Sequence, residues 1–87
     1  MKDLEFAVLD ELYFVTSFSS LSQATNIDEQ KLVDAIESLL NKKYITQLIM
    51  EPGMKDFEKL ETPDFSILPK SFFVATKDGL LEHNSRA

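Results

Sequence analysis

The side chains that could support catalysis are few in this sequence, and they are poorly placed for it. The single histidine, His83, lies near the C-terminus beside Glu82, and the 87 residues include no cysteine. A zinc site needs three or four protein ligands, which one histidine without cysteine does not provide. We therefore expect no metal site, no thiol chemistry and a solvent-exposed imidazole.

The fifteen acidic residues do not form an evident catalytic pair. The adjacent pairs Asp10-Glu11 and Asp28-Glu29 fall in segments with helical spacing, where neighbouring side chains point apart. Serine and threonine occur without a partner base, and the two glycines are too far apart for a phosphate-binding loop. The sequence therefore predicts that the protein is not an enzyme and holds no cofactor.

The composition is typical of one small globular domain with an acidic surface. Hydrophobic residues make up 44% of the chain, charged residues 28%, and the net charge is −6. Acidic residues interrupt the apolar N-terminal segment, and no apolar run approaches the ~18 residues of a membrane span. We expect a single domain over residues 1–87, a cytoplasmic location and no contact with a membrane.

The stretch from residue 28 to residue 43 has the clearest helical pattern in the chain. Asp28 suits the N-cap, while Lys42 and Lys43 suit the negative end of the helix. Residues 44–50 follow with the features of a strand. The apolar stripe of this helix recurs at helical spacing and consists of Leu32, Ile36, Leu39 and Leu40.

Two further helices are expected before this one. The first spans residues 3–18, and a short second helix over residues 19–26 would be capped by Ser19 or Ser20 and ended by a left-handed Asn26. The apolar face of the first helix comprises Leu4, Val8, Leu12 and Val15. Phe6, Tyr13 and Phe14 widen this apolar surface. Two interpretations stay open: they meet another chain, or Phe6 and Tyr13 cover the wing or the C-terminal segment.

Residues 51–70 have the features of a long loop between two strands. Pro52-Gly53 ends the first strand, and the mixed charge that follows allows a one-turn helix around residues 55–60. The return strand is expected over residues 71–76, and Thr76 would cap a final helix over residues 77–83. An alternative takes Asp78-Gly79 as a hairpin turn, which is weaker because only a short polar tail follows.

This order of elements resembles the winged helix-turn-helix superfamily, which includes the MarR-like and PadR-like bacterial regulators. The resemblance implies an α+β fold, namely a three-helix bundle with a β-wing and a short C-terminal helix. The family often has glycine before the first wing strand, where this chain has Lys43, so a left-handed turn there would either be strained or be replaced by a different geometry. The resemblance is carried by the segment 72–82 and by Leu32, Ile36, Leu39, Tyr44 and Ile45.

For function, the resemblance implies a transcription regulator that acts as a homodimer and places its third helix in the major groove of DNA. The family arrangement puts Asp28, Glu29, Gln30, Lys31, Asp34, Ala35 and Ser38 on the groove-facing side. The candidate DNA contacts are Gln30, Lys31, Ser38, Lys42, Lys43, Lys55 and Lys59.

The charge of these segments favours a second hypothesis. Residues 28–43 hold four acids against three lysines, and residues 51–70 hold five acids against three lysines. Phosphate contacts need cations or neutral donors, so this charge opposes DNA binding. The alternative function is an acidic winged-helix module that binds another protein, with Phe6, Tyr13 and Phe14 as its contacts.

Overall fold

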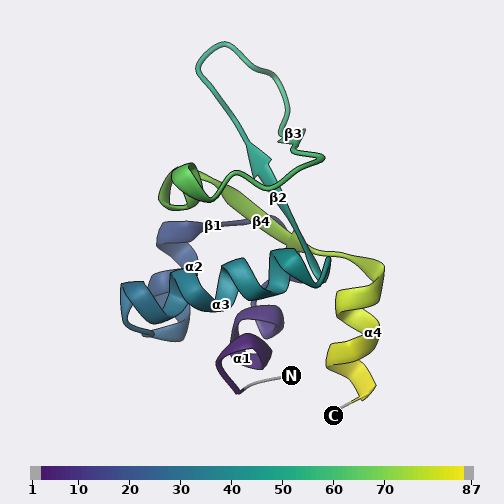
Figure 1. Ribbon diagram of the computed structural model, residues 1–87. Helices are drawn as coiled ribbons and strands as arrows, with labels where there is room; N and C mark the ends of the chain where they lie inside the picture. The colour runs from purple at the N-terminus through teal and green to yellow at the C-terminus, as the bar shows by residue number, and fades with distance from the viewer. Residues whose placement is uncertain (1–2, 86–87) are drawn as a thin grey trace.

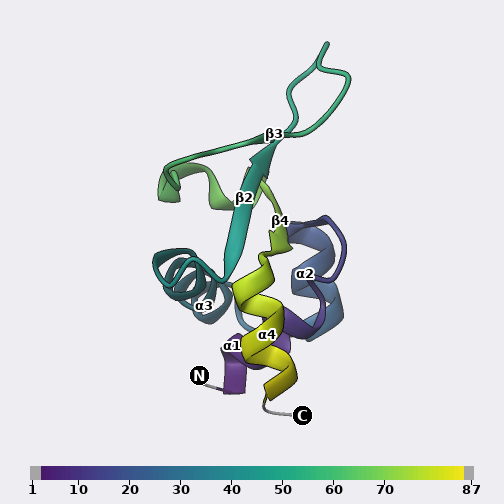
Figure 2. The ribbon, with the colours of Figure 1, turned by 90° about the vertical axis from the view of Figure 1, so that its right-hand side faces the viewer.

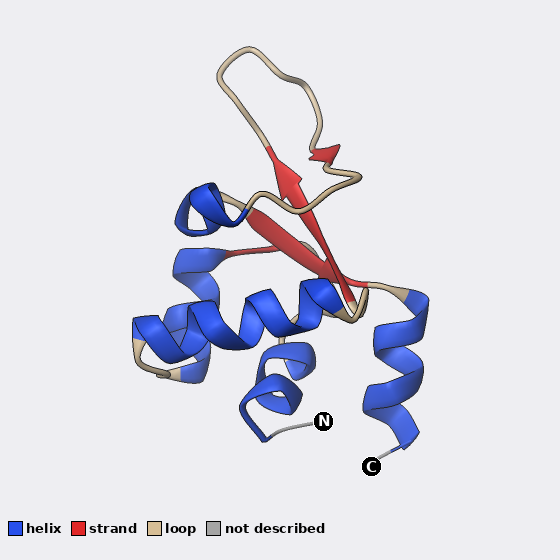
Figure 3. Ribbon diagram, in the orientation of Figure 1, coloured by secondary structure: helices blue, strands red, loops and turns tan. Residues whose placement is uncertain are grey.

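A small antiparallel sheet lies over a group of four helices in the computed structural model, which describes residues 3–85 (Figure 1). The helices are α1 (Asp3–Asp10), α2 (Phe18–Thr25), α3 (Glu29–Asn41) and α4 (Lys77–Ser85), with a 3-10 helix η1 (Phe65–Lys70). The strands are β1 (Thr16–Ser17), β2 (Ile45–Ile49), β3 (Glu58–Lys59) and β4 (Phe72–Ala75), in the sheet order β1-β4-β2-β3. Figure 3 shows the four α-helices gathered on one side of the strands and the long β2–β3 loop extending away from them.

The core is built around α3, because its apolar stripe is buried along its length. Leu32, Ile36 and Leu39 are inaccessible to solvent, and Leu40 is nearly so. The stripe joins one hydrophobic core with residues from α1, α2 and the sheet, including Phe73 of β4. Figure 2 shows α3 at one edge of the molecule and α2 on the opposite side, which leaves the outer face of α3 uncovered.

Helix α1 ends at Asp10, so the prediction of one helix over residues 3–18 is wrong beyond that point. The residues that follow α1 include the run 13–16, Tyr-Phe-Val-Thr, whose side chains favour extended backbone. The carbonyl of Leu12 accepts a hydrogen bond from the amide of Ala75 at 2.8 Å, and Thr16 pairs with Phe73. Pairing with β4 therefore replaces the last two helical turns that the spacing predicts.

The helix-turn-helix begins earlier than the sequence predicts. Ser17 is the N-cap of α2, rather than Ser19 or Ser20, and its hydroxyl accepts from the backbone N–H of Ser20 at 3.1 Å. Burial of Phe18 in the core draws this residue into the helix. Asn26, with φ of +54°, confirms the left-handed end predicted for α2.

The ends of α3 agree only partly with prediction. Asp28 occupies the N-cap position, but its side chain makes no capping hydrogen bond. The helix ends at Asn41, so Lys42 is its C-cap residue and Lys43 lies beyond it. Lys43 has φ of +63°, so of the two alternatives at this position the chain adopts the left-handed turn before β2.

The wing, defined as residues 50–64, projects from the end of β2 (Figure 1). The one-turn helix predicted around residues 55–60 is wrong, because residues 58 and 59 form β3 and pair with β2. The ring of Phe57 packs against that of Phe72 with centroids 4.8 Å apart. The helical turn lies further on, in η1, where Asp64 accepts hydrogen bonds from the backbone and hydroxyl of Ser66.

Helix α4 follows β4 as predicted, and the alternative of a hairpin at Asp78-Gly79 is wrong. Thr76 caps it: its hydroxyl oxygen accepts from the N–H of Gly79 at 3.1 Å and its hydroxyl donates to the carbonyl of Lys43 at 2.8 Å. Gly79 lies against the backbone of Tyr44, where an added Cβ would be 2.0 Å from the Tyr44 oxygen. Glycine at this position lets α4 approach the start of β2.

Candidate functional site

The outer face of α3 is polar and carries more acid than base. Gln30 and Asp34 are exposed one turn apart, and the Gln30 amide donates to Asp34 Oδ1 at 3.0 Å. Glu37 continues this face, and Lys31 is exposed beside it. The side chain of Gln30 therefore keeps its carbonyl oxygen and one N–H for an outside partner.

Two of the predicted DNA contacts are already engaged with α1. Ser38 Oγ and Lys42 Nζ each donate to Glu5 Oε1 at 2.9 Å. Glu5 is 1% exposed, whereas the side chain of Lys42 remains 42% exposed. Ala35, which the family arrangement puts on the groove-facing side, is buried. This part of α3 faces α1 rather than solvent.

A cleft of about 210 Å³ follows the seam between α1 and α3. Ligand sites commonly enclose 300 Å³ or more, so the cleft is small for an organic ligand. The Glu5 carboxylate that lines the cleft already accepts hydrogen bonds from Ser38 and Lys42. The residues that line it are Leu4, Glu5, Lys31, Asp34, Ala35 and Ser38.

The remaining lysines of the candidate set extend from α3 to the wing. Lys31, Lys43, Lys55 and Lys59 are exposed, and none of them forms an ion pair with another residue in the range 3–85. Lys55 and Lys59 alternate with acids of the wing, so the wing has no continuous positive strip. Within the candidate set, these four ammonium groups are open to an anionic partner.

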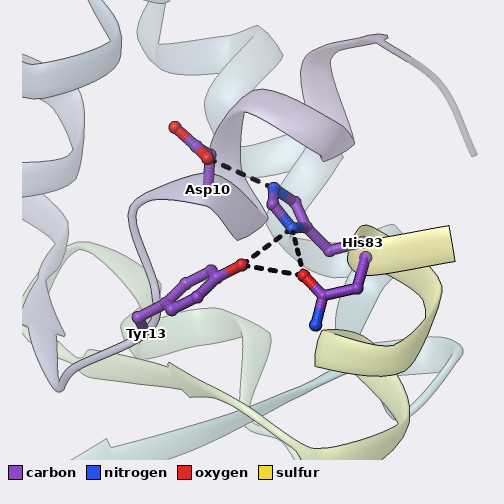
Figure 4. Close-up of polar contacts among 4 residues, drawn as sticks. Asp10, Tyr13 and His83 are labelled. Atoms are coloured by element: carbon purple, nitrogen blue, oxygen red, sulfur yellow. Dashed lines mark hydrogen bonds and ion pairs between the residues drawn. The ribbon is translucent and has the colours of Figure 1, made fainter. Parts of the chain in front are cut away.

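His83 lies in a second polar cluster, between α4 and α1, so the expectation of a solvent-exposed imidazole is wrong (Figure 4). Its Nε2 is 3.2 Å from Asp10 Oδ1 and its Nδ1 is 3.0 Å from the Tyr13 hydroxyl. Phe6 stacks on the imidazole with centroids 4.4 Å apart. Helix α4 continues to Ser85 and carries His83 onto α1, which the short polar tail did not predict.

The chain of carboxylate, imidazole and phenol resembles an acid–base relay, but its geometry fits a structural role. Asp10 and Tyr13 occupy both nitrogens of His83, and Phe6 covers one face of the ring. No nitrogen is left for a substrate proton. The cluster fastens α4 to α1, and Phe6 and Tyr13 cover the C-terminal segment, as the second interpretation of these residues predicts.

Phe14 is the most exposed of the three predicted partner contacts. Its side chain is 82% exposed, compared with 46% for Tyr13, and Phe6 is partly covered by His83. Over residues 3–85, no group of three metal-binding side chains occurs, and no helix is long and apolar enough to cross a membrane.

No protein-family model matches the chain, and no curated protein sequence matches it. Among solved structures, the chain is similar to BpsR of Bordetella bronchiseptica, with a TM-score of 0.68 and 21% sequence identity. The chain has a winged-helix fold. The aligned region covers 98% of this chain and 52% of BpsR, so this chain spans about half the length of that protein. The BpsR structure concerns the regulation of its DNA binding by 6-hydroxynicotinic acid.

Two buried polar residues of this winged helix were missed by the sequence analysis. Glu5 shares the helical spacing of Val8, Leu9 and Leu12, so its position on the apolar stripe was a usable signal of burial. Gln47 lies two residues after Ile45 in β2, and strand alternation places both side chains on the same face. Both residues hold neighbouring elements through hydrogen bonds.

Proposed function

We propose that the chain is a regulatory protein that binds double-stranded DNA, with α3 in the major groove and the wing against the adjacent backbone. The observation that carries the proposal is the fold similarity to BpsR, a protein with regulated DNA binding, over 98% of this chain. The exposed outer face of α3 supports the proposal, because a recognition helix needs such a face. The inference is by analogy of fold.

The contacts divide by chemistry into base readout and phosphate binding. Gln30 can pair with adenine through its carbonyl oxygen and the N–H that it does not donate to Asp34. Lys31, Lys43, Lys55 and Lys59 would bind phosphates, because they are exposed and form no ion pair among the described residues. Ser38 and Lys42 would join them only by leaving Glu5.

Because acidic residues lie beside these lysines, we expect weak binding to random DNA with a small dependence on salt. Each phosphate contact contributes about −0.9 to the slope of log affinity against log salt. Four lysines, opposed by acids such as Asp34 and Glu37, give a shallow slope and weak binding to random DNA. Useful affinity would then depend on base contacts and on two copies of the chain reading two half-sites.

A selection from random duplex DNA at ~50 mM salt, where phosphate contacts are strong, tests this function. We expect an enriched sequence, and we expect Lys31→Ala to weaken its binding about tenfold or more. Lys77→Ala is the matched control, since Lys77 is an exposed lysine on α4, outside α3 and the wing. Failure to enrich any sequence would contradict DNA binding, and an equal loss with Lys77→Ala would contradict binding through α3.

A second candidate function, protein binding, is favoured by the exposure of Phe14. An aromatic side chain that is 82% exposed, next to Val15 at 40%, offers apolar area that a partner would cover. Sedimentation of the chain with and without Phe14→Ser tests self-association through this segment. A monomer that enriches DNA and is unchanged by Phe14→Ser would set this candidate aside.

A further inference from the structure

Gln47 is a buried polar residue at the base of the wing, and its side chain is bonded at both ends. It lies in β2, is 1% exposed, and accepts at Oε1 from the backbone N–H of Asp64 at 2.9 Å. Its Nε2 donates to the carbonyl of Asp64 at 3.0 Å and to Ser71 Oγ at 2.8 Å. Its backbone carbonyl accepts from the N–H of Leu60 at 3.0 Å.

These bonds replace strand pairing where the wing returns to the body. Strand β3 is two residues long and pairs only as far as Lys59. Beyond it, the amide of Gln47 binds both the N–H and the C=O of Asp64, as a residue of a neighbouring strand would. An uncharged amide side chain can donate and accept in this way at once.

The same side chain links the wing to the 3-10 helix. Asp64 caps η1 through Ser66, and Ser71, at the end of η1, donates to the carbonyl of Ile67 at 2.7 Å. Gln47 contacts both Asp64 and Ser71. One side chain of β2 therefore joins the return of the wing, η1 and the start of β4.

We propose that Gln47 is the positioning residue of the wing: its hydrogen bonds to Asp64 and Ser71 hold residues 50–64 in a fixed direction relative to α3. The part of this inference that concerns DNA rests on the proposed function. Lys55 and Lys59 lie in this segment, and the two-residue pairing of β3 with β2, which includes Lys59, is the other link between the wing and the body. When the wing is released, these two lysines lose their fixed distance from Lys31 on α3.

Hydrogen exchange on the free protein tests the positioning role without DNA. Gln47→Met keeps the length of the side chain and removes its hydrogen bonds. We expect the amides of Leu60 and Asp64 to exchange at least tenfold faster, while those of Leu39 and Leu40 in α3 change much less. Val8→Ala, a core substitution on α1, is the control for general loss of stability. Equal acceleration in the wing and α3, as in the control, overturns the proposal.

A double-substitution experiment on the selected DNA tests the consequence for binding. In the native background, Lys55→Ala with Lys59→Ala should weaken binding severalfold and flatten its salt dependence. In the Gln47→Met background, the same lysine substitutions should have little further effect, because the wing is already released. Equal factors in the two backgrounds contradict the coupling. If the native chain selects no DNA, the proposed function fails, and the exchange rates of Leu60 and Asp64 decide the positioning role.

Discussion

Glu5 and Lys42 form an ion pair of 2.9 Å that joins α1 to the C-terminal end of α3. The carboxylate side is almost wholly buried, with 2% of the Glu5 side chain exposed, and the ammonium side is open to solvent. A lysine that is a candidate DNA contact therefore neutralises a buried acid. The position of the proposed recognition helix depends on α1 through this pair.

Removal of the Lys42 charge should destabilise the fold. Lys42→Met leaves the buried carboxylate of Glu5 without this cation, which we expect to lower the free energy of unfolding by about 1–2 kcal/mol, below the value for a fully buried pair because Lys42 is half-exposed. Urea unfolding measures the change. Lys31→Met is the matched control, since Lys31 has no ion pair among the described residues. Equal stability of the two variants would contradict the role of the pair.

The cluster around His83 should hold α4 in place. His83→Ala removes the bonds to Asp10 and Tyr13 and the stack on Phe6, so we expect a loss of about 2 kcal/mol and faster hydrogen exchange in α4. Leu81→Ala on the same helix is the control, because Leu81 is 58% exposed. An α4 that exchanges at the native rate in His83→Ala would show that the helix is held by other contacts.

The fold could be predicted from the sequence where local pattern and tertiary packing agree. The stripe of α3, the left-handed residue Asn26 and the Thr76 cap each follow from a few neighbouring residues. The end of α1 at Asp10 could not be predicted this way. Thr16 pairs with Phe73, which lies 57 positions later in the chain, and this pairing overrides the helical spacing of the residues after Asp10. The spacing of apolar residues within one segment does not indicate which distant segment it pairs with.

The candidate site was harder to predict, for the same reason. Gln30, Lys31, Lys43, Lys55 and Lys59 are exposed, and their role in DNA binding stays a prediction. Ser38 and Lys42 have the spacing of surface residues, yet they bind Glu5, which lies 33 and 37 positions away in the chain. His83 is drawn inward by Asp10 and Tyr13 in the same manner. The position of a polar residue on a helix or near the chain end does not indicate which distant residue it will bind.

The two glycines should differ in their tolerance of alanine. Gly79→Ala places a methyl group 2.0 Å from the Tyr44 oxygen and forces α4 away from β2, which we expect to cost about 2 kcal/mol despite the better helix propensity of alanine. Gly53 has φ of +91° with open space around it, so Gly53→Ala should cost about 1 kcal/mol from backbone strain alone. Urea unfolding of both variants checks the order, and a stabilised Gly79→Ala variant would contradict the close packing of α4.

Asp64 should stay ionised to a lower pH than an ordinary aspartate. The hydroxyl of Ser66, and then its backbone N–H, donate to the carboxylate and lower the pKa of Asp64. Because the folded pKa lies below the unfolded one, the cap contributes stability above the unfolded pKa and loses it as pH falls through the folded pKa. An NMR titration of the carboxyl carbon should show this shift, and Ser66→Ala should reduce it. An Asp64 pKa that Ser66→Ala leaves unchanged would exclude the hydroxyl as its cause.

The most direct test of DNA binding through α3 and the wing is an NMR titration of the ¹⁵N-labelled chain with the duplex that the selection enriches. We predict that the largest amide shifts fall in residues 29–34 of α3 and residues 51–59 of the wing, with α4 unaffected. The absence of shifts, or shifts confined to residues 11–15 around Phe14, would contradict the proposed mode of binding.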